Sequence, residues 1–369
     1  HELRTPMNAI IGMTEMLAGE DKTNSKADET ATINGAAYSL LTLINDVLTY
    51  SKIESGNLQL SPEQYNFSGL IKNVLNTAGR STEKRKIDFF ADIAPDIPSV
   101  LYGDDSIIQQ IYEYILLGAI NNTDTGRIMM DITDTVESEK NRVRIITRIS
   151  DTGEGLSDSE YKSLFNSFDT YDSRTDSGIK KYGLELTICR ELLKMMDGDM
   201  KVESIQGVGT AVTFEFCSFI IEKDPIVYTG YPVKKDVLIY VAYDNMRKRW
   251  NSLMENFGIF PEFASSYASF DIKLREKQYD FIMIQDYAYE DISGLIDLYR
   301  AADNTYVVTG YSHVFGEFGK CRIMRRPVSC VNICDILNGK WDRKDYEDKD
   351  KTEAFFAPDA RVLVVDDNM

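Results

Sequence analysis

The sequence predicts a multidomain protein with an antiparallel helical hairpin, an α+β sandwich and a doubly wound parallel α/β unit, in that order. Three patterns predict this order. Apolar residues first recur in alternating steps of four and three, the period of a helix with one buried seam. Strand-like alternation then mixes with helical spacing. A repeated succession of strand, helix and strand, which is typical of parallel sheets, comes last.

The helical hairpin is expected over residues 1–60. The polar connection GEDKTNSKAD separates its two seams, which predicts two antiparallel helices. One narrow apolar seam needs a cover, and a second copy of the chain supplies it most simply, so we expect a homodimer with a four-helix bundle. The seam consists of Leu3, Met7, Ile10, Thr14 and Leu17, followed by Ile33, Ala37, Leu40, Ile44, Val47 and Ser51.

The α+β sandwich is expected over residues 61–222. Four stretches alternate, or nearly alternate, apolar and polar residues as strands do: KIDFFADI, GRIMMDIT, NRVRIITRIS and GTAVTFEF. Two stretches carry helical spacing: SIIQQIYEYILLGAI and GLELTICRELLKMM. This mixture of strands and helices predicts an α+β domain.

The parallel α/β unit is expected over residues 236–342, after a linker at 223–235. Its strands are DVLIYVAY, YDFIMIQD and TYVVTG, with MRKRWNSLMENFG as the first helix between them. A charged linker of mixed sign follows at 343–359. The stretch RVLVVDDN, within residues 360–369, reads as the first strand of another such unit.

Composition excludes several classes of partner. With 41 basic and 59 acidic residues the net charge is −18, which repels nucleic acid and anionic lipid, so we expect no nucleic-acid partner. The most apolar run, AVTFEFCSFII, is too short and too alternating to span a bilayer, so we expect no direct membrane contact. Five scattered cysteines without a CxxC pair favour a reducing compartment and indicate neither a disulfide frame nor a zinc site.

A nucleotide site is suggested where the predicted strand TRISD runs into DTGEGL. Asp151 at a strand end can accept a hydrogen bond from an exocyclic amine, and Gly153 and Gly155 let the backbone pass close to a planar base. Taken alone, this spacing is more often a turn than a nucleotide site. KYGLELTI then places Gly183 at a helix start, where free amides favour phosphate, and GVGT follows before a strand.

The segments HELRTPMNAIIGMTEML, INDVLTYSKIESG, YGDDSIIQQIYEYILLGAI, SDTGEGL, LFNSF, YGLEL and GVGT stand in the order typical of one family. Through them, residues 1 to about 221 resemble the dimerisation and ATP-binding domains of a sensor histidine kinase. The resemblance implies that His1 is the phosphoacceptor, with Glu2 as the base that orients its imidazole and Thr5 at the position associated with dephosphorylation of the partner. A solvated, exposed histidine is the alternative for His1.

The same resemblance implies the nucleotide contacts. Asp151 takes the adenine-binding position, Gly153 and Gly155 the hinge, and Thr210 the late GxGT threonine. ATP and Mg²⁺ are the implied cofactors. We expect this chain to be the cytoplasmic portion of a full-length protein that is anchored in the membrane.

The sequence departs from the family at the phosphate end of the site. Gly118 stands where the family has a magnesium-coordinating asparagine, and Asn122 lies one helical turn beyond it. The GxGLGL motif reads KYGLEL, so that the Glu185 carboxylate is expected to repel a polyphosphate. Lys180 and Lys181 are expected to offset part of this repulsion by contacting phosphate directly.

The parallel unit resembles a response-regulator receiver in its layout. A working receiver needs acids after its first strand and an aspartate after its third. Here only Asp244 remains of the acidic pair, and Gln285 stands at the acceptor position. Asp286 follows one residue late, and a slip of one residue on a strand predicts that its side chain points the other way.

The supporting residues of a receiver are nevertheless present as Thr309 and as Arg326 before Pro327, with arginine in place of lysine. We therefore interpret residues 236–342 as a pseudo-receiver, used for packing or partner contact. Asp366 and Asp367 in the final VLVVDDN match an intact acidic pair, which predicts a metal site at the start of a true receiver.

Together these features predict a hybrid sensor histidine kinase that transfers a phosphoryl group from ATP to His1 and then to a receiver aspartate. Its expected partners are the receiver in the same chain and a response regulator or phosphotransfer protein. One alternative is a pseudokinase scaffold, a dimeric adaptor whose His1 is phosphorylated by another kinase; Gly118, Glu185 and Gln285 favour it. In a third interpretation, His1 and Thr5 serve phosphatase activity only.

Overall fold

The computed structural model describes residues 10–11, 24–83, 85–164, 184–227, 235–241, 244–313 and 316–340. Eight of the predicted site residues lie outside this set, and their predicted roles stay predictions. They are His1, Glu2, Thr5, Lys180, Lys181, Gly183, Asp366 and Asp367.

The long helix α2 (Asn24–Glu54) ends where the sequence predicts, just before the glycine of IESGN. Ala37, one of its predicted seam residues, is buried together with Ile11, and Leu41 and Ile44 pack against them. Other seam residues of α2 are exposed in the single chain, including Leu40. One side of the helix is thus packed within the chain, while an apolar stripe beside it faces outward.

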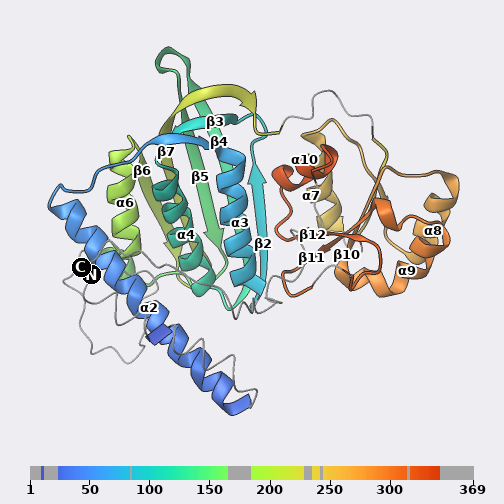
Figure 1. Cartoon of the computed structure of the whole chain (residues 1–369), viewed down its shortest axis with the longest axis horizontal. Helices are drawn as coiled ribbons and strands as arrows, with labels where there is room; N and C mark the ends of the chain where they lie inside the picture. Colours follow the sequence, from blue (N-terminus) through green and yellow to red (C-terminus); the bar gives the residue numbers. More distant parts are fainter. Residues whose placement is uncertain are drawn as a thin grey trace, which may run out of the picture.

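A seven-stranded mixed sheet forms the next unit (Figure 1), with strand order β1-β3-β7-β5-β4-β2 and β6 also paired to β7. Only β2 and β4 run parallel; the other neighbours are antiparallel. The strands are β1 (Glu63–Asn66), β2 (Lys86–Ile93), β3 (Pro98–Gly103), β4 (Thr125–Glu137), β5 (Arg142–Asp151), β6 (Asp199–Ile205) and β7 (Gly209–Pro225). The four strands predicted from alternation are β2, β4, β5 and β7, and β7 continues into the stretch expected as a linker.

The helices α3 (Phe67–Glu83), α4 (Asp105–Asn121) and α6 (Glu185–Met195) lie side by side on one face of this sheet (Figure 1). The short α5 (Asp158–Ser163) follows β5, and the 3-10 turn η1 (Ser138–Lys140) joins β4 to β5. The start of α4 is fixed by Asp104, whose side chain accepts a hydrogen bond from the Ile107 amide (3.1 Å). The buried face of α4 carries Tyr112, which stacks edge-on against Phe214 of β7 and bonds to Thr147 of β5. These contacts fix α4 on the sheet. We call β1–β7 together with α3–α6 the mixed-sheet unit.

A second sheet has five parallel strands in the order β12-β11-β10-β8-β9. Its strands are β8 (Val237–Tyr240), β9 (Glu262–Ala264), β10 (Phe281–Gln285), β11 (Thr305–Thr309) and β12 (Arg322–Arg325). Its helices are α7 (Asp244–Glu255), α8 (Tyr267–Glu276), α9 (Tyr289–Leu298) and α10 (Cys330–Leu337), with 3-10 turns η2 (Asp286–Ala288) and η3 (Ala302–Asn304). We call this the parallel-sheet unit.

Helices cover both faces of the parallel sheet, because successive strand residues point to opposite sides. Val237 and Ile239 of β8 belong to one apolar cluster, with side chains of α7 and α10. Leu238, between them, belongs to a second cluster, with side chains of α8 and α9. The alternation therefore gives this unit two cores, one on each face of the sheet.

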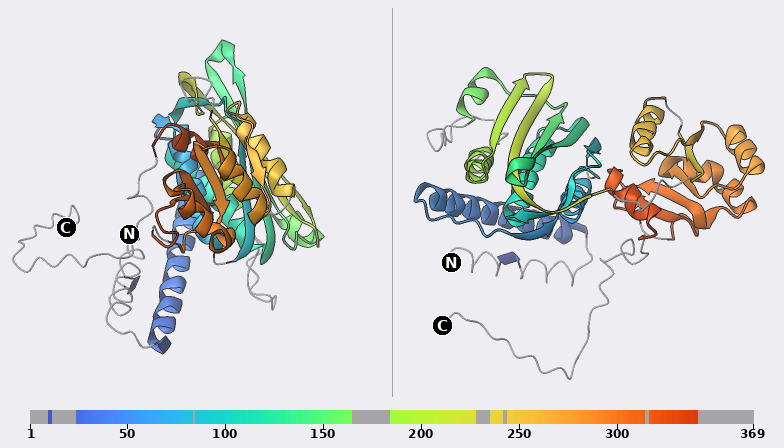
Figure 2. Two further views of the ribbon diagram at one scale, coloured as in Figure 1. Left: turned by 90° about the vertical axis from the view of Figure 1, so that its right-hand side faces the viewer. Right: turned by 90° about the horizontal axis from the view of Figure 1, so that it is seen from above.

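The two units pack against each other. Strand β2 is an edge of the mixed sheet, and α7 and α10 lie beside it (Figures 1 and 2); α10 also contacts α3. The core of the mixed-sheet unit is contiguous with the cluster under α7 and α10. At the edge strand itself, the Arg249 guanidinium lies 3.9 Å from the centroid of the Phe90 ring, and the Cys330 thiol donates to the Ile93 carbonyl (3.3 Å).

Two predictions about the whole chain can be compared with the described residues. Within them, no helix combines the length and the apolar character that crossing a membrane requires. All five cysteines are free thiols; four of them are buried, and Cys217 is half-buried.

Candidate nucleotide-binding site

Asp151 is the last residue of β5, and its carboxylate is held by the backbone. Its Oδ1 accepts hydrogen bonds from the amides of Gly153 (2.9 Å) and Thr210 (3.3 Å). The side chain is nearly buried, with 7% of its surface exposed. A carboxylate with two backbone donors on one oxygen has a fixed orientation, which is what selective recognition of an exocyclic amine requires.

Gly153 and Gly155 lie where the backbone approaches other backbone too closely for a side chain. A Cβ on Gly153 would lie 2.0 Å from the carbonyl oxygen of Asn122, at the end of α4. Gly155 has a φ of +65°, and a Cβ there would lie 2.1 Å from the carbonyl oxygen of Ile205. The sequence predicted that these glycines let the backbone approach a planar base; in the structure they let it approach the backbone of Asn122 and Ile205, and contact with a base stays a prediction.

Thr210 joins the same site through β7. Its hydroxyl shares a hydrogen bond with Ser204 of β6 (2.8 Å), and Ser204 also accepts the amide of Leu156 (2.8 Å). Ser204 thus connects the segment after Asp151 to the β6–β7 hairpin, a role that the motif search missed. The signal was present, because a turn at QGVG places Ser204 opposite Thr210 in the hairpin register.

The predicted residues Asp151, Gly153, Gly155, Thr210 and Asn122 therefore meet at one end of the mixed sheet. Asn122 is the C-cap of α4, where its amide donates to the Gly118 carbonyl (3.1 Å). Gly118, one turn earlier, has no side chain to offer a metal. Within the described ranges, no three His, Cys, Asp or Glu side chains gather as a metal site would need. The described residues fit an adenine base better than they fit a magnesium ion.

Glu185 begins α6, and its charge acts at the junction with α2. Asp46 of α2 is buried; burial raises its pKa, a hydrogen bond from the Tyr114 hydroxyl lowers it, and the neighbouring Glu185 raises it further. Among the described residues, Oε2 of Glu185 is buried without a hydrogen-bond partner. Burial raises the pKa of the Cys189 thiol, and Glu185 adds to that shift. The Tyr114–Asp46 hydrogen bond therefore joins α2 to α4, whereas Glu185 of α6 repels Asp46; neither interaction was predicted from the sequence.

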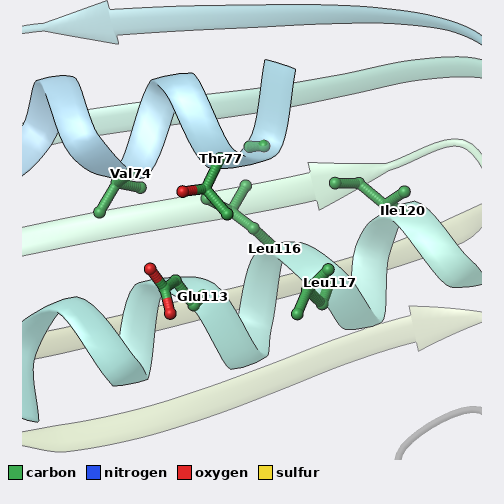
Figure 3. Close-up of a pocket in the computed structure, with 7 residues that line it drawn as sticks. Val74, Thr77, Glu113, Leu116, Leu117 and Ile120 are labelled. Carbon is green, nitrogen blue, oxygen red and sulfur yellow. The ribbon is translucent and has the colours of Figure 1, made fainter. Parts of the chain in front are cut away.

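A small cavity lies elsewhere, between α3 and α4 (Figure 3). Val74 and Thr77 line it from one helix, and Glu113, Leu116 and Ile120 from the other. Its volume of about 10 Å³ holds at most one water molecule, so it is a packing gap and not a ligand site.

Asp286 in the parallel-sheet unit corrects a prediction. Its Oδ2 accepts hydrogen bonds from the Thr309 hydroxyl (2.9 Å) and from the Arg326 guanidinium (2.5 Å). The expectation that Asp286 points away from these residues is wrong. The alternation of a strand ends at Gln285, which is buried, and the chain then turns into the 3-10 helix η2, which brings Asp286 back to the sheet edge.

Two family models match the chain. Residues 1–56 match the His Kinase A (phospho-acceptor) domain, and residues 103–218 match the histidine kinase-, DNA gyrase B- and HSP90-like ATPase. The second match contains Asp151, Gly153, Gly155 and Thr210. The two models thus follow each other in the order that the motifs predicted.

Curated relatives are similar over the same part. The peroxide stress-activated histidine kinase mak2 of Schizosaccharomyces pombe is 31% identical over 218 residues, 58% of this chain and 9% of that protein. The sensor histidine kinase RcsC of Escherichia coli K12 is 31% identical over 237 residues, 64% of this chain and 24% of that protein. The chain therefore spans no more than about a quarter of the length of these relatives.

A solved structure extends the similarity in fold. The crystal structure of full-length ShkA in complex with AMPPNP superimposes with a TM-score of 0.62 at 20% sequence identity, over 93% of this chain and 71% of that one. At this identity the similarity concerns the fold alone. The two domain matches, and the similarity to relatives such as the hybrid signal transduction histidine kinase F of Dictyostelium discoideum (35% identical over 223 residues, 58% of this chain and 20% of that protein), show that the chain carries the phospho-acceptor and ATPase domains of a histidine kinase.

Proposed function

We propose that this chain binds ATP at the Asp151 site and transfers its γ-phosphoryl group to His1. The observation that carries the proposal is the Asp151 carboxylate, whose orientation is fixed by the amides of Gly153 and Thr210. A carboxylate fixed in this way accepts a hydrogen bond from the exocyclic amine of adenine without reorganising. The comparisons favour the kinase over the pseudokinase scaffold.

The chemistry at His1 is proposed from the resemblance. The imidazole nitrogen forms a bond to the γ-phosphorus, the bond from phosphorus to the β–γ bridging oxygen breaks, and ADP leaves with that electron pair. Glu2 accepts the imidazole proton, and the phosphoryl group then passes to a receiver aspartate. Thr5, Gly183, Lys180 and Lys181 keep the roles that the resemblance implies.

The described residues do not fit a magnesium ion. Gly118 offers no ligand at the family's metal position. Asn121 is also engaged, since its Oδ1 accepts from the Arg85 guanidinium (3.4 Å). We propose that a magnesium ion, if it accompanies ATP, is held mainly by phosphate oxygens.

We propose further that the chain acts as a homodimer through α2. Ile33, Leu40 and Val47 recur every seven residues and keep 49%, 48% and 36% of their surface exposed. Exposed apolar residues at this spacing form a stripe that a second copy would cover in a four-helix bundle. The partners proposed beyond the dimer are a receiver domain and a response regulator or phosphotransfer protein. No nucleic-acid partner is proposed, and the cytoplasmic placement stays a prediction from sequence.

The parallel-sheet unit is proposed to be a receiver-like domain that does not take part in phosphotransfer. Support comes from Gln285 at the end of β10, at the position where a receiver has its acceptor aspartate, and from the acidic pair, of which only Asp244 remains. A phosphodonor such as acetyl phosphate should leave this unit unlabelled.

Calorimetric titration of the full chain with ATP tests the nucleotide site. We expect saturable binding that falls at least tenfold in Asp151→Asn, since the amide replaces an acceptor oxygen with a donor facing the adenine amine. Gly118→Asn is the matched variant on α4 and should raise the affinity in the presence of Mg²⁺. If the Asp151→Asn variant binds ATP as tightly as the unaltered chain, ATP does not bind at Asp151.

A further inference from the structure

The interface between the two units uses specific polar contacts on α3. The Ser312 amide and hydroxyl both donate to Oε1 of Glu83 (2.6 Å each). The Tyr311 hydroxyl donates to Oδ1 of Asn76 (2.8 Å). At the other end of the interface, Lys72 of α3 forms an ion pair with Asp335 of α10. The loop 310–312, which follows β11, is thus held by the last two turns of α3.

Close packing at two glycines makes the fit specific. A Cβ on Gly79 of α3 would lie 2.6 Å from the Tyr311 ring and 2.7 Å from the Arg326 carbonyl oxygen. A Cβ on Gly310 would lie 2.3 Å from Oε1 of Glu83. Neither glycine has a positive φ, so the backbone of each is compatible with a side chain. At both glycines the opposite unit occupies the space that a methyl group would fill.

The same turn of α3 reaches the nucleotide site. Arg85, two residues after Glu83, donates from its guanidinium to the carbonyls of Ile120 (3.0 Å) and Asn121 (3.4 Å) at the end of α4. The next carbonyl, that of Asn122, is the one against which Gly153 packs. The contacts of the loop 310–312 with Glu83, and those of Arg85 with the end of α4 beside the backbone that meets Gly153, therefore begin two residues apart in the chain.

The loop is also joined to the Asp286 cluster. Thr309, which holds Asp286, directly precedes Gly310, and the amide of Arg326 donates to the Thr309 carbonyl (3.0 Å). The Asp286 carboxylate thus fixes both Thr309 and Arg326, which border the interface. A change in the charge at Asp286 would alter the same residues that meet α3.

We propose that the parallel-sheet unit regulates the nucleotide site of its own chain, by clamping the end of α3 with the loop 310–312 and so fixing the end of α4 beside Gly153. The effect of the loop 310–312 on the end of α4 does not depend on the proposed function. Its effect on ATP binding does depend on the proposed function. Contiguity alone does not establish coupling, so the test must displace one end and observe the other.

Gly79→Ala displaces the loop selectively, because alanine favours the helix α3 while its methyl group collides with Tyr311 and Arg326. Gly69→Ala is the matched control in the same helix, since its Cβ would meet only Asn66, at 3.7 Å. Hydrogen exchange of the full chain without nucleotide gives the readout. The reporters are the amides of Asn122 and Thr123, which donate to carbonyls of α4, and that of Gly153, which donates to Asp151.

We expect Gly79→Ala to speed exchange about tenfold both in 309–313 and in the reporter amides, while Gly69→Ala exchanges like the unaltered chain. Arg85→Gln should speed exchange at Asn122 and Thr123 but not in 309–313. It removes the guanidinium contacts with the end of α4 and leaves the contacts of the loop with Glu83 in place. Faster exchange of 309–313 in Gly79→Ala with unchanged reporter amides would overturn the proposal, and so would an unchanged loop. The measurement needs no ATP, so a failure of the clamp and a failure of the proposed function are distinguishable.

Discussion

Gly153→Ala gives the most quantitative prediction for the nucleotide site. The added Cβ would lie 2.0 Å from the Asn122 carbonyl oxygen, where ordinary van der Waals contact begins at 3.4 Å. One of the two segments must therefore move by up to 1.4 Å, the difference between these distances. The obstacle is the backbone at the C-cap of α4, so no side-chain rotation relieves it. Overpacking of this kind costs about 1–3 kcal/mol.

The same displacement acts on ATP binding, because the Gly153 amide holds Asp151. A shift of about 1 Å in a positioning group can cost on the order of a hundredfold in function, so we expect ATP affinity to fall by about 10- to 100-fold. Thermal unfolding should show a decrease of about 2–4 °C per kcal/mol for a domain of this size. Calorimetric titration of the full chain with ATP measures the affinity.

Gly294→Ala provides the control, because this glycine lies in α9 with nothing within 4 Å of the added Cβ. We expect it to stabilise the protein by about 0.5–1 kcal/mol through the preference of alanine for helix, without changing ATP affinity. An unchanged unfolding temperature and unchanged ATP affinity in Gly153→Ala would refute the reasoning.

Three further predictions concern the core, the dimer and acid stability. Tyr112→Phe removes the 2.7 Å hydrogen bond to the fully buried Thr147 and should destabilise the mixed-sheet unit by about 1–3 kcal/mol; an unchanged unfolding temperature would argue against it. Leu40→Asp should weaken dimerisation at least tenfold, as measured by sedimentation, without unfolding the chain. If the variant dimerises as tightly as the unaltered chain, α2 does not form the dimer interface. Hydrogen bonds from Lys273 and then Lys277 lower the pKa of Glu262 to about 2, so its contribution is present above pH 4.5 and is lost as the pH falls toward 2. These three side chains are partly exposed, so the decrease in unfolding temperature over this range should be small, weaker in salt and absent in Glu262→Gln.

Much of the mixed-sheet unit was predictable because its signals are local. Alternation in KIDFFADI and GTAVTFEF identified β2 and β7, and helical spacing identified α4 and α6. Asp151 and its glycines were singled out by a strand end and a turn encoded within a few residues, but their predicted roles came from the later motifs and the family resemblance. The helix α3 was not predicted, although its buried residues recur at helical spacing from Phe67 to Thr82.

Contacts between distant segments had no such signal. Tyr114 and Asp46 are 68 residues apart, and Glu83 and Ser312 are 229 residues apart. Neither pair is recognisable until the units are packed together. Asp286 was misjudged for a different reason: the strand rule was applied one residue past the end of β10, where η2 begins. The periodicity of a strand predicts the direction of its side chains only up to the last residue of that strand.

Phosphorylation of His1 is the most direct test of the proposed kinase activity. The full chain is incubated with ATP labelled at the γ-phosphate, with Mg²⁺, and the label is located by peptide mapping. We expect an acid-labile label on His1 that is absent in His1→Gln and at least tenfold weaker in Asp151→Asn. An unlabelled chain that becomes labelled only with Gly118→Asn would contradict it, because the kinase fold would then be present without the activity proposed for it.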